Sequence, residues 1–539
     1  MQTTHSLPAV LSASFFFIRR GAGCAPRVSG LERTGADIPP PALTNGTASI
    51  TMALARAQSS RRPGLSRVRA ALLSLAGLSA LSPLTDSSCQ AGTHAASEEI
   101  WVGTWTTAPQ LVEPGNMPPA PGLANNSLRQ VVRVSIGGDT LRVKFSNEFG
   151  TGPVTMNAVH IAASAGGSTI ALSTDRELKF GGVPSVTMGA GTVVTTDPIA
   201  FPLTPRMDVA ITIYFGQTSS PVTGHPGSRT TSYIVAGNTP ATTDFTGAVT
   251  TDHWYDIDAI DVLAPSTAGA VAILGNSITD GRGSTTNMHN RWPDVFSESL
   301  RRDSSTQRVG VLNQGIGGNC VLAGGLGPTG VSRYDRDILG QSAVRWAIVL
   351  EGVNDIGGVT SAGAATTVAA NLINAYAQMI LKAHGRNVRI YGATILPFKG
   401  NGYFNQYSES CRETVNQWIR TPGNFDACID FDRIMRDPQD TLRLVSTYQN
   451  DGLHPDTAGY RKMGLSIDLS LFAGADTLTM GLAPVRGDHG FSLDQNYPNP
   501  PNSPTVLPFA LAACTFVTPF DGAFASVSIT PANKSVSAK

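Results

Sequence analysis

The sequence predicts an α/β fold with a parallel sheet, preceded by a separate antiparallel β-sandwich or jelly-roll-like domain. Two patterns predict this order. Between residues 100 and 262, apolar residues alternate with polar ones, which is the period of half-buried strands. Between residues 268 and 475, short continuous apolar runs alternate with helix-like stretches, which is typical of parallel strands covered on both faces. The length of 539 residues also exceeds what one compact core usually holds.

The composition is that of a folded, loop-rich chain without a charge bias. Hydrophobic residues make up 41% and charged residues 14%, with 56 Gly and 35 Pro. The 39 basic and 39 acidic side chains cancel, so nothing favours binding to nucleic acid or to an anionic membrane. No uninterrupted apolar run reaches about 18 residues, so no membrane-spanning helix is expected.

The six cysteines fit no pattern of metal ligands. Neither a CxxC nor an HExxH motif occurs, so neither a metal nor a redox site is expected. A disulfide between Cys411 and Cys428 is one alternative if the protein is exported. Reduced, buried thiols are the equally weighted alternative, and the state of Cys320 stays open with them.

Residues 1–97 are expected to form a tail and a secretory signal rather than a domain. After Met52, Arg61 and Arg62 precede an apolar run at 70–84 and then small polar residues, which is the order of a signal peptide. The arginine pair also resembles a twin-arginine signal. We therefore expect Met52 as the true start and a secreted or periplasmic protein. A disordered N-terminal tail is the alternative.

Residues 98–265 form the predicted β-sandwich domain. Apolar residues with polar neighbours between them mark its strands: Val132, Val134 and Ile136, then Leu141, Val143 and Phe145, then Val209, Ile211, Ile213 and Phe215. Arg142, Lys144 and Ser146 are expected to face outward. His225 and Arg229 place an imidazole and a cation on a Gly/Pro loop. They are candidate substrate-binding residues, although most such loops are solvated turns.

Residues 266–476 form the predicted α/β domain. Four apolar runs predict buried strands, and one long stretch predicts a helix. The runs lie at 270–274, 309–312, 347–350 and 388–393, and the helix lies at 362–384. In an open parallel sheet, ligands bind at the carboxyl ends of the strands. The residues that follow each run are therefore the candidates for chemistry.

Three strand ends and one later loop present polar groups. Ser277 follows the first run, a glycine-rich loop with Gly318 follows the second, and Asn354 follows the third. Asp451 and His454 lie in a loop near the end of the domain. A serine nucleophile needs a base and an acceptor that orients the base. His454 and Asp451 have the chemistry for these two roles.

The same strand ends offer donors for an oxyanion. They are the backbone N–H groups of Ser277 and Gly318 and the carboxamide of Asn354. Each residue alone is a weak indication, because a serine after a strand is usually a helix N-cap. Their succession at consecutive strand ends predicts a Ser–His–Asp site. Asp280 is expected only to cap or orient the adjacent helix.

Four segments together resemble the four blocks of the SGNH (GDSL-type) hydrolases. They read Gly-Asn-Ser-Ile-Thr-Asp-Gly, the Gly318 loop, Gly-Val-Asn-Asp and Asp-Gly-Leu-His-Pro, and they span about 268–475. The resemblance implies a flavodoxin-like three-layer fold and an ester hydrolase. It also implies the residue roles: Ser277 as nucleophile, Gly318 and Asn354 as oxyanion donors, and His454 as base with Asp451.

One position departs from the family's usual Gly-Asp-Ser block. Asn276 stands where the aspartate normally precedes the serine. We expect this change to alter the local hydrogen bonding rather than the activity.

The segments outside the α/β domain carry further resemblances. Residues 101–105, 146–150 and 225–227 resemble bacterial SGNH proteins with an N-terminal β domain, a group that includes relatives associated with xylan and other carbohydrate esters. Residues 491–500 resemble the opening of C-terminal sorting domains of secreted Bacteroidetes-type proteins. Residues 477–539 are therefore expected to be a linker and a truncated remnant of such a domain.

The sequence thus predicts a secreted serine carboxylesterase that hydrolyses short-chain esters through an acyl-enzyme. No metal and no cofactor are expected, and the expected partner is a small-molecule or carbohydrate ester. A carbohydrate acetylesterase of the xylan type is the alternative within this class. A non-catalytic glycan-binding protein is the alternative outside it.

Overall fold

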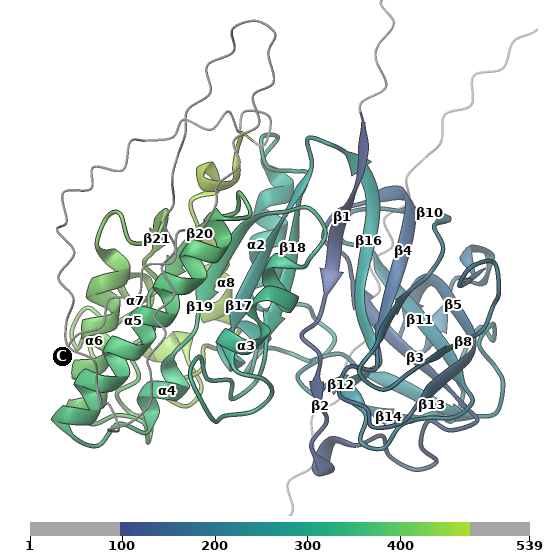
Figure 1. Ribbon diagram of the computed structural model, residues 1–539, viewed down its shortest axis with the longest axis horizontal. Coiled ribbons are helices and arrows are strands. Elements are labelled where there is room, and N and C mark those ends of the chain that lie inside the picture. The colour runs from purple at the N-terminus through teal and green to yellow at the C-terminus, as the bar shows by residue number, and fades with distance from the viewer. Residues whose placement is uncertain (1–97, 475–539) are drawn as a thin grey trace, which may run out of the picture. The chain divides into compact units, whose positions relative to one another are not determined.

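The computed structural model describes residues 98–474. Their first part, up to Pro265, consists of antiparallel strands that pair into two large sheets and one small one (Figure 1). The first sheet has the order β1 (Glu99–Thr106), β16 (Ile257–Pro265), β4 (Gly138–Ser146) and β10 (Ile199–Leu203), with β9 (Val193–Thr195) paired to β4. The small sheet has the order β15 (Trp254–Tyr255), β12 (Thr223–His225) and β2 (Gln110–Leu111).

The second large sheet lies around the longest strands of this region. Its order is β14 (Val249–Thr251), β13 (Ser232–Ala236), β3 (Asn126–Arg133), β11 (Asp208–Phe215), β5 (Val154–Gly166) and β6 (Thr169–Ile170). Two short strands, β7 (Arg176–Glu177) and β8 (Val186–Met188), also pair with β5. The antiparallel β domain predicted from the alternating pattern is therefore confirmed.

The apolar residues of the predicted strands are buried as the alternation predicts, but the polar residues between them are less exposed than predicted. The apolar residues of β11 and β4 named above are fully buried, as expected. The expectation that the intervening residues of β4 face outward is wrong. Arg142 and Lys144 are half-buried, since Arg142 Nε donates to Asp261 at 2.9 Å and Lys144 Nζ lies 3.9 Å from Asp258. Ser146 is fully buried, and its hydroxyl accepts a hydrogen bond from the next turn of the chain.

Five parallel strands form the sheet of the second part. Their order is β18 (Val309–Gly315), β17 (Gly269–Gly275), β19 (Val344–Leu350), β20 (Arg389–Ala393) and β21 (Ala427–Ile429). Every neighbouring pair is parallel, so the predicted α/β fold is confirmed. Four of these strands coincide with the predicted apolar runs. The edge strand β21 was not predicted, because three residues are too few to give a pattern.

Helices flank this sheet, as Figure 1 shows. The two longest, α5 (Ala362–His384) and α6 (Gln406–Arg420), pack on each other, as do α2 (Trp292–Arg302) and α8 (Thr457–Leu465). The bounds of α5 are those that the sequence predicted. The remaining helices are short: α1 (Ser277–Asp280), α3 (Gly330–Tyr334), α4 (Val353–Gly357) and α7 (Phe431–Met435). Single 3-10 or π turns lie at Pro114–Asn116, Leu172–Thr174, Asp335–Leu339, Ser446–Tyr448 and Leu469–Phe472.

The strand-rich part and the α/β part contact each other directly, and all described residues belong to one compact unit. The N–H of Gly103 in β1 donates to the carbonyl of Ser342 at 3.0 Å. The N–H of Val311 in β18 donates to the hydroxyl of Ser135 at 3.0 Å. A Cβ at position 103 would lie 2.9 Å from the Leu312 side chain, so only glycine fits there without displacing that leucine.

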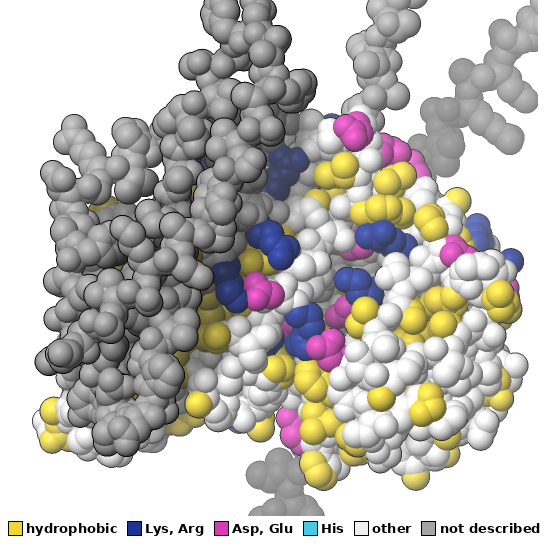
Figure 2. Space-filling model, in the orientation of Figure 1, with side chains coloured by type: hydrophobic (Ala, Val, Ile, Leu, Met, Phe, Trp, Pro, Cys, Tyr) yellow, Lys and Arg dark blue, Asp and Glu magenta, His cyan; other side chains and the backbone are white. Residues whose placement is uncertain are grey.

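The surface and the cysteines bear on two further predictions. Figure 2 shows blue basic and magenta acidic side chains interspersed on the face in view, in keeping with the zero net charge. Within residues 98–474, no helix has both the length and the apolarity needed to cross a bilayer. Of the two alternatives left open for Cys411 and Cys428, the structure has the free thiols: one is buried in α6 and the other is exposed on β21.

Several predictions concern parts of the chain that the structure does not describe. The signal segment and Met52 lie in residues 1–97, and the sorting-domain remnant lies in residues 477–539. These expectations stay predictions, as do the exact domain boundaries.

Candidate active site

The candidate nucleophile lies on a sharp turn between β17 and α1. Asn276 caps this helix, since its Oδ1 accepts a hydrogen bond from the N–H of Ile278 at 3.1 Å. Ser277 is the first helical residue, so its own N–H has no acceptor within the helix. Gly281 ends the turn with a left-handed φ of 100°. The strand, the cap and the glycine together hold Ser277 at the carboxyl edge of the parallel sheet.

Ser277, His454 and Asp451 are joined by hydrogen bonds in the order that the sequence suggested. Ser277 Oγ lies 2.9 Å from His454 Nε2, and His454 Nδ1 lies 2.8 Å from Asp451 Oδ2. A carboxylate only accepts hydrogen bonds, so Nδ1 carries the hydrogen and Nε2 is left to accept from the serine hydroxyl. The other oxygen of Asp451 accepts from the backbone N–H of His454 at 2.8 Å and fixes the loop.

The surroundings tune both members of the His–Asp pair. Burial lowers the pKa of His454 below its ordinary value, and the positive charges of Arg282 and Arg229 lower it further, whereas Asp451 opposes the shift. Partial burial alone would raise the pKa of Asp451, but hydrogen bonds from the backbone and the ring of His454 outweigh it and the pKa is lowered. At neutral pH the imidazole is therefore available as a base and the aspartate is ionised.

This electrostatic arrangement predicts how the activity depends on pH. Activity should fall in acid as His454 takes up a proton, with a midpoint below the ordinary histidine pKa. Arg229→Gln removes one of the charges that oppose protonation, so the pKa of His454 should rise and the acid limb of kcat/KM should move to higher pH. The pH profile of the variant is the measurement. Arg176→Gln changes an exposed arginine on β7 and should leave the acid limb of kcat/KM at the wild-type pH. The same acid limb in the wild type and in both variants would contradict this account.

Gly318 follows β18 in a loop next to the nucleophile turn. Its φ of 70° is left-handed, and a Cβ there would lie 3.2 Å from the Leu326 side chain. A glycine suits this conformation because it has no Cβ. The N–H of Gly318 forms no hydrogen bond with any described residue, while its carbonyl accepts from Leu326 N–H at 3.0 Å. One donor at this strand end is thus left unused by the fold.

Asn354 lies in α4, directly after β19, and its carboxamide is held from both sides. Nδ2 donates to the carbonyl of Asn319 at 2.7 Å, and Oδ1 accepts from the hydroxyl of Tyr403 at 3.1 Å. Only the second Nδ2 hydrogen remains for a substrate atom. Tyr403 was not foreseen as part of the site, because it comes from a loop far along the sequence.

A buried arginine that the sequence analysis missed connects two strand ends at the site. Arg333 in α3 donates to the carbonyls of Gly275 at 3.0 Å and Gln314 at 2.6 Å, and to Oδ1 of Asn319 at 3.0 Å. It therefore ties the ends of β17 and β18 to the loop beside Gly318. Asp355 fixes the same loop by accepting from Val321 N–H and Leu322 N–H, both at 2.9 Å.

The asparagine that replaces the usual aspartate has a clear structural role. Asn276 Nδ2 donates to Oε2 of Glu351 at 2.7 Å, and both side chains are buried. Burial raises the pKa of Glu351 to about 8, although Arg333 and the Asn276 hydrogen bond lower it. An aspartate at 276 would face a second carboxyl group here. The asparagine donates to one oxygen of Glu351 without adding a charge, as the expectation of changed local hydrogen bonding implied, while Oε1 has no hydrogen-bond partner among the described residues.

Glu351 should make the stability of the fold pH-dependent. Its pKa is higher in the folded chain than the ordinary value of 4.5, so the folded state binds the proton more tightly. Its contribution is fully present below the ordinary pKa and is lost as pH rises through about 8. Glu351→Gln removes this loss, so the variant should gain stability relative to the wild type as pH rises, by at most about 5 kcal/mol. Urea unfolding across this pH range checks the prediction, and a difference that is flat with pH would refute it.

His225 and Arg229 lie next to the nucleophile turn, but His225 does not face solvent. It is buried, with Nδ1 3.0 Å from the carbonyl of Ala108 and Nε2 2.9 Å from Oδ1 of Asp280. The ring is thus held between two hydrogen-bond acceptors, one from the strand-rich part and one from the nucleophile turn. The predicted substrate contact therefore does not fit the position of His225. Arg229 is partly exposed, with one nitrogen 3.9 Å from Oδ2 of Asp280.

Asp280 also differs from its expected role. It was expected to cap or orient the adjacent helix, yet it is the last residue of α1 and its carboxylate is buried against the strand-rich part of the chain. Asp280 lies three residues after Ser277, in the same helical turn. The hydrogen bond between His225 in β12 and Asp280 therefore holds the nucleophile turn in place. No group of three or more His, Cys, Asp or Glu that would suit a metal ion occurs among residues 98–474.

A serine, a histidine and an aspartate joined in this order at the carboxyl edge of a parallel sheet are the arrangement of serine hydrolases. Residues 273–462 match the GDSL-like Lipase/Acylhydrolase family. The match is confined to the α/β part of the chain and contains Ser277, Asp451 and His454. The resemblance that the four sequence blocks suggested is thereby confirmed.

Several solved structures are similar to part of this chain. A lipase/acylhydrolase from Enterococcus faecalis is 17% identical with a TM-score of 0.30, covering 39% of this chain and 99% of its own. A GDSL-like lipase from Bacteroides thetaiotaomicron is 16% identical with a TM-score of 0.28, covering 38% and 87%. An acetyl xylan esterase is 19% identical with a TM-score of 0.28, covering 36% and 96%. No curated protein shows significant similarity to the chain.

Proposed function

We propose that this protein is a serine carboxylesterase that hydrolyses short-chain carboxylic esters through an acyl-enzyme. One observation carries the proposal: the continuous hydrogen bonds from Ser277 Oγ to His454 Nε2 and from His454 Nδ1 to Asp451. These three groups supply a nucleophile, a base and the acceptor that orients the base. The family matched by residues 273–462 supports hydrolysis as the reaction class.

The proposed reaction follows from the geometry of the site. His454 Nε2 accepts the proton of Ser277 as Oγ attacks the ester carbonyl, and the carbonyl oxygen becomes an oxyanion. The N–H groups of Ser277 and Gly318 and one Nδ2 hydrogen of Asn354 donate to that oxygen. His454 then gives its proton to the leaving alcohol, and water deacylates Ser277 by the same steps in reverse order. Asp451 stabilises the cationic imidazole each time it forms.

Arg229 is the residue through which the strand-rich part is proposed to contact substrate. It is partly exposed, and its charge acts on His454, so it lies at the margin of the site. A guanidinium there would donate to an oxygen of the alcohol portion of the ester. Arg229→Ala should therefore raise KM more than it changes kcat. Unchanged kinetic constants would remove Arg229 from the substrate site.

The substrate class is tested by comparing two kinds of ester with the same preparation. p-Nitrophenyl esters from acetate to laurate should be hydrolysed with a preference for the shortest acyl groups. Acetylated xylan is the second arm, and acetate release from it that far exceeds turnover of p-nitrophenyl acetate would identify a carbohydrate acetylesterase. Turnover of neither kind would contradict the esterase proposal and favour a glycan-binding protein.

Export is part of the proposal. The arginine-rich segment at 61–69 and the apolar run at 70–84 support it, and both precede the described residues. N-terminal sequencing of protein recovered outside the cytoplasm of the producing cells should find a start near residue 92. An N-terminus at residue 1 or 52 in that fraction would show that no signal peptide is removed.

A further inference from the structure

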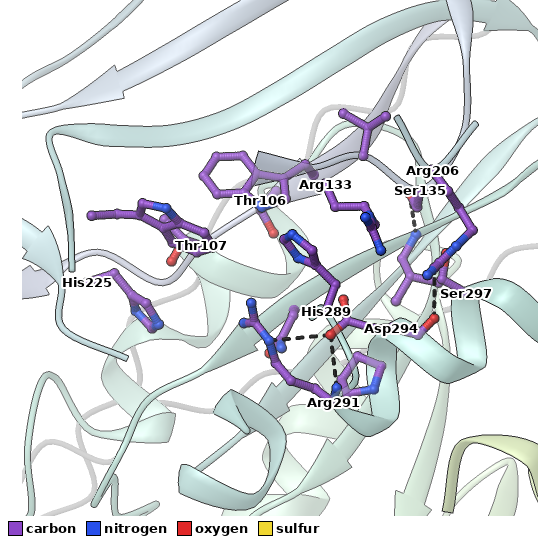
Figure 3. A pocket seen from close by; sticks show the side chains of 16 residues that line it. Thr106, Thr107, Arg133, Ser135, Arg206, His225, His289, Arg291, Asp294 and Ser297 are labelled. Carbon is purple, nitrogen blue, oxygen red and sulfur yellow. Dashed lines mark hydrogen bonds and ion pairs between the residues drawn. The ribbon is translucent and has the colours of Figure 1, made fainter. Parts of the chain in front are cut away.

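A small polar cavity lies between the strand-rich part and the α/β part, separate from the Ser–His–Asp array (Figure 3). Its volume is about 40 Å³. One side is formed by residues at the ends of β1 and β3, and the other side by the start of α2. Three arginines and one histidine are among the residues that line it: Arg133, Arg206, Arg291 and His289.

Three buried hydroxyl groups at the cavity have no hydrogen-bond partner among the described residues. They belong to Thr106, Thr107 and Ser297, each at most 5% exposed. Nε of the buried Arg291 also forms no hydrogen bond, and its nearest carboxylate oxygen, on Asp294, is 3.4 Å away. Buried polar groups are almost always satisfied in native proteins. Four such groups around one cavity indicate that something polar occupies it.

The charges around the cavity do not balance. Arg133 makes a two-pronged ion pair with Asp208, with both distances 2.7 Å. Arg291 has Asp294 as its neighbour. Arg206 has no carboxylate of its own, and its Nη1 donates only to the backbone carbonyl of Asp294, at 2.9 Å. One guanidinium charge is therefore left over at the cavity.

The histidine at the cavity does not change this balance. Burial lowers the pKa of His289 to about 4, so the ring is neutral at physiological pH. It has a hydrogen to donate but no charge to add. Burial also lowers the pKa of Arg206, which shows that its charge is poorly solvated where it stands. Donors and one excess positive charge fit an anion, and they disfavour a cation.

We propose that this cavity binds one small monovalent anion of the size of chloride. The anion accepts hydrogen bonds from Arg206, Arg291 and the free hydroxyl groups, and it balances the charge of Arg206. The volume leaves room for such an ion with a water or two, since one water needs roughly 10–15 Å³ of such space. Larger anions such as gluconate do not fit.

The surface around the cavity offers a path for the ion. Arg133, Arg206 and His289 also line an adjoining open groove of about 470 Å³. These three residues therefore stand between the groove and the cavity. The groove also carries Arg461 of α8 and one carboxylate, Glu298, which is paired with Arg302, so cations outnumber anions along the path. The bound anion would join the turn before β11 to the first turn of α2, and so stabilise the contact between the two parts of the chain.

Thermal unfolding of the full chain tests the proposal. The melting temperature should be higher in sodium chloride than in sodium gluconate at equal ionic strength. This difference should grow with chloride concentration and then level off, as binding to the folded state requires. Arg206→Gln should abolish the difference between the two salts. Arg176→Gln, the exposed-arginine control, should keep it. Equal melting temperatures of the wild type in both salts, or a chloride response that survives Arg206→Gln, would overturn the proposal.

A second measurement does not depend on the variant being folded. Crystals of the wild-type protein grown in bromide should give an anomalous peak in the cavity, within hydrogen-bond distance of Arg206 and Arg291. Ordered water alone in the cavity, with bromide peaks only elsewhere, would also overturn the proposal.

Discussion

Replacing Ser277 with alanine should lower kcat for p-nitrophenyl acetate by about 10⁴-fold or more, because no other group near His454 replaces the nucleophile. Ser277 Oγ is the only side-chain atom bonded to His454 Nε2 among residues 98–474. The fold should be unaffected, because the N-cap hydrogen bond of α1 comes from Asn276 rather than from Ser277. Initial rates and the far-ultraviolet circular dichroism of the two proteins check both statements.

The matched control for this variant is Ser446→Ala. Ser446 opens a short 3-10 turn in the chain segment leading to the Asp451 loop, and its side chain makes no hydrogen bond with a described residue. This variant should retain wild-type turnover. Turnover by Ser277→Ala within tenfold of wild type would show that the nucleophile lies elsewhere.

Replacing His225 with leucine should reduce both stability and kcat. The change leaves the buried Asp280 carboxylate with only Arg229, whose nitrogen is 3.9 Å away. Removing the hydrogen-bond partner of a buried carboxylate commonly costs about 3–5 kcal/mol. Because Asp280 ends the helical turn that begins with Ser277, we expect kcat to fall by roughly 10- to 100-fold, as for other small displacements of reacting groups. Urea unfolding and kcat measured on the same preparation give the two numbers.

The control for His225 is an exposed pair of the same chemistry. His384 Nε2 lies 3.1 Å from Asp426, and both side chains are at the surface of the α/β part. His384→Leu should cost no more than about 1 kcal/mol and leave kcat unchanged. The double variant His225→Leu/Asp280→Leu should lose less stability than the sum of its two single variants, because it leaves no unpaired charge. Strict additivity would mean that the two residues do not act as a pair.

The fold and the linear order of the site residues could be predicted from the sequence because both depend on local patterns. The period of two before residue 265 and the apolar runs after it gave the two kinds of sheet. The bounds of α5 follow from a single uninterrupted stretch between Ser361, its N-cap, and Gly385. Ser277, Gly318 and Asn354 follow three adjacent parallel strands, and such strands end at one edge.

The parts of the site that were not predicted depend on contacts between distant segments. Arg333 is buried among the carbonyls of two strand ends, yet in the sequence it is one charged residue in a short helix. His225 stands in a Gly/Pro loop that looks exposed, and only its distance of 2.9 Å from Asp280 shows that it is internal. Ser146 was misjudged for the same reason, since burial on the second face of an element leaves no periodic signal.

The proposed covalent chemistry is tested most directly by labelling the folded protein with a fluorophosphonate and locating the adduct by peptide mass spectrometry. The proposal predicts one adduct, on Ser277, that forms in the wild type and is greatly slowed in His454→Ala, which lacks the base. An adduct on another serine, or none in protein that is folded by circular dichroism, would contradict the assignment of Ser277 as the nucleophile.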